Sequence, residues 1–262
     1  MKANSILSCR KVTVSFDGFK AVQEMSLELE AGELRFLIGP NGAGKTTMLD
    51  AICGKVKPAS GSVEFNGRKG KVDVTKRREH EIAQLGIGRK FQTPSIFSGL
   101  SVEENLEISM SQNRGVWATL RASMTKGERE RIDAELELIG LGDKKKLRAG
   151  LLSHGEKQWL EIGMMLLQEP EILLLDEPVA GMTDKETEKT GELLQEIVRK
   201  RTVVVVEHDM EFVRNFASKV TVMHEGKLLK EGSMDDIQSD DRVAEVYLGR
   251  KRRDYDVVSS TA

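Results

Sequence analysis

Gly39-Pro40-Asn41-Gly42-Ala43-Gly44-Lys45-Thr46 directly follows an apolar run, Leu34 to Ile38, and leads into a helix-forming segment, Thr46 to Ile52. This is the pattern G-x-x-x-x-G-K-[ST] in the strand–loop–helix context in which it binds phosphates. The glycines let the backbone curl, so that successive N–H groups converge on anionic oxygens. An ordinary glycine-rich turn is not expected to meet all the fixed positions in this context. The stretch therefore predicts a nucleotide-binding phosphate loop.

The side chains of this loop suggest how it would hold a nucleotide. The N-terminus of the following helix presents its positive dipole end to anions. Lys45 adds a mobile positive charge for the outer phosphates, and the Thr46 hydroxyl can ligate Mg²⁺. The residues predicted to bind nucleotide here are Gly39, Pro40, Asn41, Gly42, Ala43, Gly44, Lys45, Thr46 and Thr47.

Composition restricts the class of protein. At 262 residues the chain fits one large α/β domain, or one domain with a subdomain. Lysine plus arginine number 40 against 42 aspartate plus glutamate, so no basic surplus indicates a nucleic-acid partner. Cys9 and Cys53 fit neither a metal motif nor a disulfide framework, which favours a reduced, cytosolic compartment. The first residues form no apolar signal sequence, and no apolar run approaches the ~20 residues that span a bilayer.

The pattern of apolar residues changes along the chain. Residues 6–32 alternate apolar and polar positions, which predicts antiparallel strands. Residues 62–67 continue this alternation and end in Asn66-Gly67, a pair typical of β-hairpins. Residues 93–152 instead place apolar side chains three and four positions apart, which predicts helices. We therefore expect an N-terminal antiparallel β-subdomain and an inserted α-helical subdomain.

Strands return after the insert. Ile172 to Leu175 and Val203 to Val206 are short, fully apolar runs, typical of central parallel strands. Between them, Thr183 to Lys200 is an amphipathic helix that opens with a capping box. The predicted fold is an α/β phosphate-loop NTPase core with a mixed parallel sheet, to which the two subdomains are added. The expected division is a core at 1–92 and 160–249, a helical insert at 93–159 and a flexible tail at 250–262.

Two carboxylates follow the strand that ends at Leu175. Ligands of α/β proteins bind at the C-terminal ends of parallel strands. We therefore expect Asp176 to hold the Mg²⁺ shell and Glu177 to polarise an attacking water. Acidic pairs are also common in loops at strand ends, but the phosphate loop upstream favours the catalytic interpretation.

Other polar residues stand at similar boundaries. His208 follows the next apolar strand and can reach the same γ-phosphate, although a lone histidine is usually structural. Gln92 lies between core and insert, where its amide oxygen can ligate Mg²⁺ or water; a surface glutamine is the alternative. Ser153 and Glu156 have the spacing of a capping box. A serine-capped helix N-terminus that carries Gly155 is also an anion site.

In their order along the chain, these features resemble the ATP-binding subunit of an ABC transporter, and the resemblance covers essentially the whole chain. It is carried by the phosphate loop, Gln92, residues 152–156, Asp176-Glu177 and His208. It implies that the ligands are ATP and Mg²⁺. It also implies that His208 holds the γ-phosphate while Lys45 and Mg²⁺ neutralise the charge that develops there.

The resemblance further implies a shared active site. Ser153 and Gly155 belong to the signature motif, which contacts the γ-phosphate of ATP held by a second ABC ATPase subunit. Gly181 to Asp184 then form the loop that communicates across the dimer. Phe16 matches the aromatic residue that stacks on adenine, with a buried core phenylalanine as the alternative role and Phe19 as a rival candidate.

Finer motifs narrow the resemblance. Residues 178–182, 207–210 and 246–249 look like the branched-chain amino-acid uptake group. Residues 152–163 are most similar to the urea-uptake branch, the UrtD-type subunit. His154 stands where the family usually has glycine, and Glu156 where it usually has glutamine. Glu156 is expected to add negative charge near a partner's ATP and so to weaken a homodimer.

The expected function is ATP hydrolysis that powers uptake of urea or a related small solute, such as branched-chain amino acids or amides. The expected partners are a second ATPase subunit in a homodimer or heterodimer, integral-membrane permeases and, indirectly, a solute-binding protein. The expected location is the cytoplasmic face of the bacterial inner membrane, with peripheral attachment. A lipopolysaccharide-export ATPase shares much of this layout. The single cassette and balanced charge argue against a non-transport ABC ATPase, and a phosphate-loop kinase leaves Ser153 unexplained.

Overall fold

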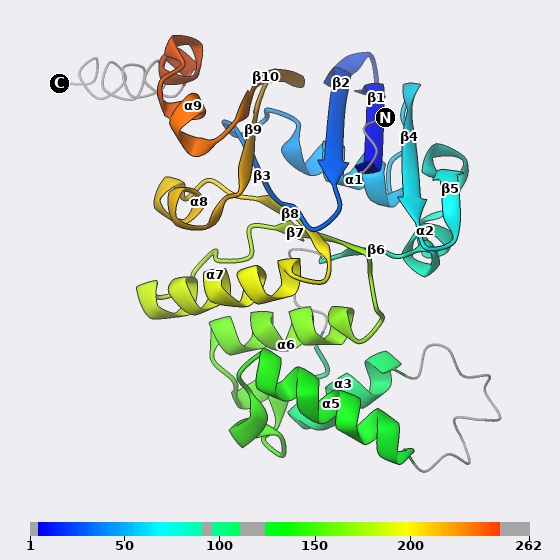
Figure 1. Ribbon diagram of the computed structural model, residues 1–262, viewed down its shortest axis with the longest axis vertical. Helices are drawn as coiled ribbons and strands as arrows, with labels where there is room; N and C mark the ends of the chain where they lie inside the picture. Colours follow the sequence, from blue (N-terminus) through cyan, green and yellow to red (C-terminus); the bar gives the residue numbers. More distant parts are fainter. Residues whose placement is uncertain (1–4, 91–95, 111–123, 247–262) are drawn as a thin grey trace.

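Two β-sheets and a set of helices form the molecule (Figure 1). The computed structural model describes residues 5–90, 96–110 and 124–246. The strands of the larger sheet are β3 (Leu34–Ile38), β6 (Ile87–Arg89), β7 (Ile172–Asp176), β8 (Thr202–Val206), β9 (Lys219–His224) and β10 (Lys227–Gly232). Their order is β10-β9-β3-β8-β7-β6, and only β10 runs antiparallel to its neighbour.

The smaller sheet is fully antiparallel, as predicted for the N-terminal region. Its strands are β1 (Ser5–Phe16), β2 (Phe19–Glu30), β4 (Ser60–Gly67) and β5 (Gly70–Asp73). They pair in the order β2-β1-β4-β5. Asp17 and Gly18 connect the first two strands with φ angles of 47° and 88°. Positive φ at both positions is the type I′ geometry that suits the twist of a two-residue hairpin.

The hairpin predicted at Asn66-Gly67 forms, but its turn lies elsewhere. Gly67 pairs with Gly70, so Asn66-Gly67 belongs to β4 and Arg68-Lys69 make the turn. The Arg68 N–H donates to both carboxylate oxygens of Glu171, at 2.9 and 3.0 Å. A contact with a distant part of the chain therefore anchors this turn, and local sequence preference did not show it.

The helices lie on both sides of the larger sheet. They are α1 (Lys45–Cys53), α2 (Glu79–Leu85), α3 (Val102–Met110), α5 (Lys126–Leu138), α6 (His154–Leu166), α7 (Asp184–Val198), α8 (Met210–Phe216) and α9 (Met234–Gln238). Short 3₁₀ turns occur at Val74–Lys76, Gly142–Lys144 and Ala149–Leu151. In Figure 1, α7 lies next to the larger sheet, and α6, α3 and α5 lie beyond it, in the layer farthest from the antiparallel sheet.

The larger sheet separates two hydrophobic cores. Val203 and Val205 pack in a core shared with α3, α5, α6, α7 and α8. Val204 and Val206 pack in the other core, with α1 and the antiparallel sheet. Successive side chains of a strand point to opposite faces. Because both faces are covered, the strand is apolar at every position, which is the pattern that predicted it.

The predicted helical insert is present as α3, α5 and the start of α6. Helix α6 continues without interruption from His154 to Leu166, so it crosses the expected boundary between residues 159 and 160. That division of the chain stays a prediction. In the described parts of the chain, no helix has both the length and the apolarity needed to cross a bilayer.

Candidate nucleotide-binding and hydrolysis site

Three neighbouring parallel strands end at one level of the larger sheet. Leu37 of β3 pairs with Val206 of β8, and Val206 pairs with Asp176 of β7. Just beyond these pairs, the Glu177 N–H donates to the Val206 carbonyl at 2.9 Å, and the Glu207 N–H donates to the Leu37 carbonyl at 3.4 Å. The phosphate loop, the acidic pair and the histidine segment therefore leave the sheet at a common edge, where α/β proteins bind ligands.

The loop between β3 and α1 is packed too closely to accept side chains at its ends. A Cβ atom on Gly39 would lie 2.2 Å from the Met223 carbonyl oxygen, and one on Gly44 would lie 2.4 Å from that of Ala21. Gly44 caps α1 in a left-handed conformation, and no side chain of the described residues forms a capping hydrogen bond there. The first N–H groups of α1 are thus left for an anion at the helix N-terminus.

Lys45 lies inside this loop. Its ammonium donates hydrogen bonds to the carbonyls of Gly39, at 2.8 Å, and Pro40, at 3.2 Å. These carbonyls hold the Lys45 ammonium close to the N-terminus of α1. Phosphate oxygens bound there would contact both the ammonium and the N–H groups of the helix. Of the predicted loop residues, Asn41, Gly42 and Thr46 are exposed, Pro40, Gly44 and Thr47 are half-buried, and Gly39, Ala43 and Lys45 are buried.

Asp176 and Thr46 fit the requirements of a Mg²⁺ site. Asp176 is buried, and neither of its carboxylate oxygens has a hydrogen-bond partner of normal geometry among the described residues. Burial raises the pKa of Asp176, while the nearby Thr46 hydroxyl and the Arg89 guanidinium act in the opposite direction. Mg²⁺ prefers oxygen ligands and is usually held by one or two carboxylates together with substrate phosphates.

Arg89 is a site residue that no sequence motif indicated. Its Nη2 lies 3.7 Å from Asp176 Oδ2. Its Nη1 donates to the Asp50 carboxylate and lies 3.4 Å from Cys53 Sγ, both on α1. Arg89 therefore connects the end of β6 with the helix that follows the phosphate loop and with the predicted metal ligand. Its partners are far away in sequence, so only the fold reveals the contact.

Glu177 and His208 face each other across the strand ends. His208 Nδ1 lies 3.6 Å from Glu177 Oε1, and both side chains are partly exposed. Glu177 has a φ of 49°, a left-handed conformation that is uncommon for any residue but glycine. Such strained backbone is typical of functional sites. The two side chains lie together at the strand ends, where a general base would meet a water beside a phosphate.

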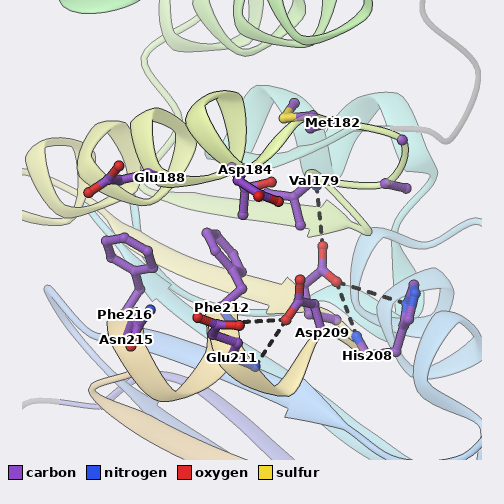
Figure 2. A pocket seen from close by; sticks show the side chains of 14 residues that line it. Val179, Met182, Asp184, Glu188, His208, Asp209, Glu211, Phe212, Asn215 and Phe216 are labelled. Atoms are coloured by element: carbon purple, nitrogen blue, oxygen red, sulfur yellow. Dashed lines mark hydrogen bonds and ion pairs between the residues drawn. The ribbon is translucent and has the colours of Figure 1, made fainter.

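A pocket of about 870 Å³ opens beside this pair (Figure 2). The loop after Glu177 and the start of α7 form one wall, which carries Met182 and Asp184. The segment after β8 and helix α8 form the other wall, with Phe212 and Phe216. His208 lies at the rim, so the pocket is continuous with the predicted hydrolytic residues.

The predicted signature residues lie at the start of α6. Ser153 caps this helix in a capping box with Glu156, as expected from their spacing. The Ser153 hydroxyl donates to Glu186 Oε1 at 2.8 Å. A Cβ on Gly155 would lie 2.7 Å from the carboxyl carbon of Glu186, so a larger residue there would displace the Glu186 side chain.

The charge of Glu156 is matched within the same chain. Its carboxylate forms an ion pair with Lys144. Burial acts to raise the pKa of Glu156, but the Lys144 ammonium and the Ser153 N–H outweigh it and hold the pKa below its usual value. Lys144 thus offsets much of the negative charge expected to oppose a partner's ATP.

The remaining predicted residues have mixed outcomes. Gln92 lies outside the described residues, so its role stays a prediction. Phe16 is 47% exposed and Phe19 is 70% exposed, which makes a core role for Phe16 wrong. They face each other across the β1–β2 hairpin. This hairpin leads to Ala21, which abuts the phosphate loop at Gly44.

Together, the fold and these strand-end residues define a phosphate-loop nucleoside triphosphatase with an inserted helical subdomain. The sequence pattern of the family described as ABC transporter matches residues 22–180. The high-affinity branched-chain amino acid transport ATP-binding protein LivG of Salmonella typhimurium is 33% identical over 253 residues, which cover 93% of this chain and 98% of LivG. The chain belongs to the ABC transporter family, as an ATP-binding subunit, and is an ATPase that uses Mg²⁺.

Solved structures agree with this assignment. The ADP conformation of MJ1267, an ATP-binding cassette of an ABC transporter, superimposes with a TM-score of 0.80 at 30% identity and covers 94% of this chain and 99% of that protein. A dimeric, post-hydrolysis state of the ATP-binding cassette MJ0796 with ADP and Pi has a TM-score of 0.72 at 26% identity, over 87% of this chain and 98% of that one. The predicted fold is thereby confirmed.

We predict that Glu177 activates the attacking water, and replacing it with glutamine tests this. Glu177→Gln keeps the shape of the side chain but cannot accept a proton. Turnover should fall by roughly 10²–10⁴-fold, the usual loss when a general base is removed. ATP binding should persist, because the phosphate loop is unchanged. Steady-state hydrolysis and nucleotide-binding assays measure the two effects, and a variant that hydrolyses ATP at the wild-type rate would refute the assignment.

Phe16 and Phe19 are both exposed, so either side chain could stack on the adenine of ATP, and alanine substitutions can distinguish them. Phe16→Ala should weaken ATP binding by about 1–3 kcal/mol, the range for loss of an aromatic stacked on a base. Phe19→Ala should have little effect, and Leu228→Ala provides an exposed apolar control on β10. Titration with a fluorescent ATP analogue measures the affinities. If Phe19→Ala weakens binding and Phe16→Ala does not, the stacking residue is Phe19.

Proposed function

We propose that this chain supplies the ATP-driven step of a bacterial importer for a small solute of the branched-chain amino-acid group. The observation that carries the proposal is the shared strand edge, which presents the phosphate loop, Asp176, Glu177 and His208 to one space. LivG, which matches this chain almost from end to end, supports the transport role by its name.

The residues of the chain divide the work of hydrolysis. The N–H groups at the start of α1 and the Lys45 ammonium bind the β- and γ-phosphates. Thr46 and Asp176 would hold Mg²⁺, which would supply positive charge to the phosphate oxygens. Glu177 orients the attacking water and takes its proton, while His208 contacts the γ-phosphate. The hydrogen bond from the Glu177 N–H to the Val206 carbonyl fixes the base relative to the sheet.

A second ABC ATPase subunit completes each site in this proposal. Ser153 and Gly155 would contact the γ-phosphate of ATP bound to that subunit, and residues 181–184 would lie against it. The dimeric MJ0796 cassette supports this arrangement by analogy. The ion pair between Lys144 and Glu156 removes an obstacle to pairing with a second copy, so homodimer and heterodimer are both compatible with the charges.

A pair of exposed apolar residues on the insert is suited to a membrane partner. Phe97 is 51% exposed and Leu151 is 71% exposed. Their segments are joined by backbone hydrogen bonds from Gly150 to Ser98, at 3.0 Å, and from Ala149 to Leu100, at 2.8 Å. We assign this surface to the cytoplasmic part of a permease, which places the chain peripherally on the cytoplasmic face of the membrane. A solute-binding protein would act through the permease.

Of the three large apolar residues at the start of the insert, Ile96, Phe97 and Leu100, Phe97 alone is exposed. Ile96 is partly buried and packs against the hydrophobic core of the insert, and Leu100 is half-buried. The exposed Leu151 was not anticipated, because it directly precedes the signature motif and no periodicity marks it.

Urea is a second candidate solute. Residues 152–163, which include His154 and Glu156, are most similar to the urea-uptake branch, and both residues make specific contacts in this structure. These contacts show that the two departures from the common signature are accommodated by the fold. They do not touch solute, so the choice between the two solutes depends on uptake measurements.

Uptake in cells lacking this subunit tests the proposed function. Loss of the gene should abolish energy-dependent accumulation of labelled leucine or of labelled urea, and the wild-type gene should restore it. Glu177→Gln should fail to restore it, because import needs hydrolysis. Loss of leucine uptake alone identifies the amino-acid importer, and loss of urea uptake alone identifies the urea importer. Undiminished uptake of both solutes would contradict the proposal.

The docking surface predicts a separation of transport from nucleotide binding. Phe97→Glu places a charge in the apolar contact with the permease, where burying an unpaired charge is costly. Solute uptake in cells should fall to background, while the purified variant binds ATP with wild-type affinity. Leu228→Glu, which changes an exposed residue on β10, serves as the matched control. Normal uptake by Phe97→Glu would remove this surface from the coupling path.

A further inference from the structure

Two consecutive residues after Glu177 are held from opposite sides. The Val179 N–H donates to Glu207 Oε1 at 3.3 Å, a contact drawn in Figure 2. The Ala180 carbonyl lies 3.1 Å from His154 Nε2. Glu207 directly follows β8 and precedes His208, and His154 begins α6 in the helical insert. Neither residue has a role in the function proposed above.

Glu207 links the loop to the histidine that contacts phosphate. It is almost completely buried, and its second oxygen, Oε2, accepts a hydrogen bond from the His208 N–H at 3.1 Å. One carboxylate therefore bridges the backbone of His208 and the backbone of Val179. Burial raises the pKa of Glu207, and the N–H donors of His208 and Val179 counteract that shift. A buried acceptor that satisfies two backbone donors is costly to remove.

His154 links the same loop to the signature helix. A carbonyl oxygen can only accept, so His154 Nε2 carries the proton in this contact. The ring also lies within 3.7 Å of the position that a Cβ on Gly181 would occupy. The adjacent Ser153 hydroxyl donates to Glu186 Oε1, and Glu186 Oε2 accepts from the Thr183 N–H at 3.0 Å. The start of α6 is thus attached to the loop directly at Ala180 and, through Glu186, at Thr183.

The loop in turn fixes the position of the catalytic base. The Ala180 N–H donates to the Glu177 carbonyl at 3.3 Å, and the Glu177 N–H is bound to Val206. Glu177 is already in a sparsely populated backbone conformation, which persists only where its surroundings hold it. A shift of Val179 or Ala180 would therefore move Glu177 relative to His208.

We propose that Glu207 and His154 are positioning residues that hold Val179 and Ala180 between the hydrolytic residues and the signature helix. Through them, the Glu177–His208 pair of one nucleotide site is mechanically connected to Ser153 of the same chain. The proposal rests on the function given above, in which Ser153 serves the nucleotide of a second subunit. It adds a route by which the state of one site reaches the other.

Turnover by purified full-length protein tests the proposal. Glu207→Gln replaces one acceptor oxygen with an N–H₂ group, and His154→Ala removes the donor to Ala180. Each should lower kcat by about 10- to 100-fold, since small misplacements of catalytic groups have effects of this size. ATP affinity should stay within about twofold, because neither residue lies in the phosphate loop. His154→Gln, whose amide N–H₂ can replace Nε2–H, should restore most of the turnover.

Matched variants control for charge and for folding. Glu130→Gln removes an exposed carboxylate from α5, and His80→Asn replaces an exposed histidine on α2; both should hydrolyse ATP normally. Thermal melting identifies any variant that fails to fold. Because Glu207 is buried, His154→Ala and its rescue by His154→Gln decide the matter if Glu207→Gln unfolds.

The double variant distinguishes a shared role from two separate ones. If both residues hold one loop segment, Glu207→Gln with His154→Ala should be about as slow as the slower single variant. Losses that multiply, or single variants that match the controls, would overturn the proposal. A wild-type protein that hydrolyses ATP but supports no uptake would contradict the proposed function instead, and the comparison of turnover rates would still judge the positioning role.

Discussion

The alignment of three parallel strand ends is the constraint on which the site depends. Leu37, Val206 and Asp176 are consecutive members of one hydrogen-bonded row across β3, β8 and β7. Each strand delivers one part of the chemistry at this row or directly after it. No single motif places the phosphate loop, the metal ligand and the histidine together, because they come from distant parts of the sequence. The backbone ladder does so, and it is buried on both faces.

Burial on both faces also explains how the two halves of the molecule remain distinct. The phosphate loop leads into α1, which packs in the core shared with the antiparallel sheet. The signature leads into α6, which packs in the core on the opposite face. Residues of these two layers come into contact at the C-terminal ends of the parallel strands. The loop after Glu177 lies there and contacts both layers. Contacts across this loop therefore join parts that otherwise share few neighbours.

The sequence predicts the parts of this site whose signals are local. The phosphate loop, the Ser153 capping box and the buried strands each depend on residues within a short window, and the structure contains all of them. The role of Arg89 was not predicted, because Asp50 and Asp176 are distant from it in sequence and contact it only in the folded chain. The turn at Arg68-Lys69 was missed for the same reason, since Glu171 holds it from far along the chain. Glu207 and His154 stood in quoted motifs, but no motif names the partner of a hydrogen bond.

The left-handed backbone of Glu177 has an evolutionary consequence. Holding a non-glycine residue in this conformation costs on the order of 1 kcal/mol or more, and glycine would relieve that cost at once. Thermodynamic selection alone would thus favour loss of the side chain at this position. A carboxylate at this position is therefore held at a cost to the stability of the fold. At position 177, catalytic activity and stability of the fold therefore favour different residues. A single substitution to glycine would give a more stable but inactive subunit.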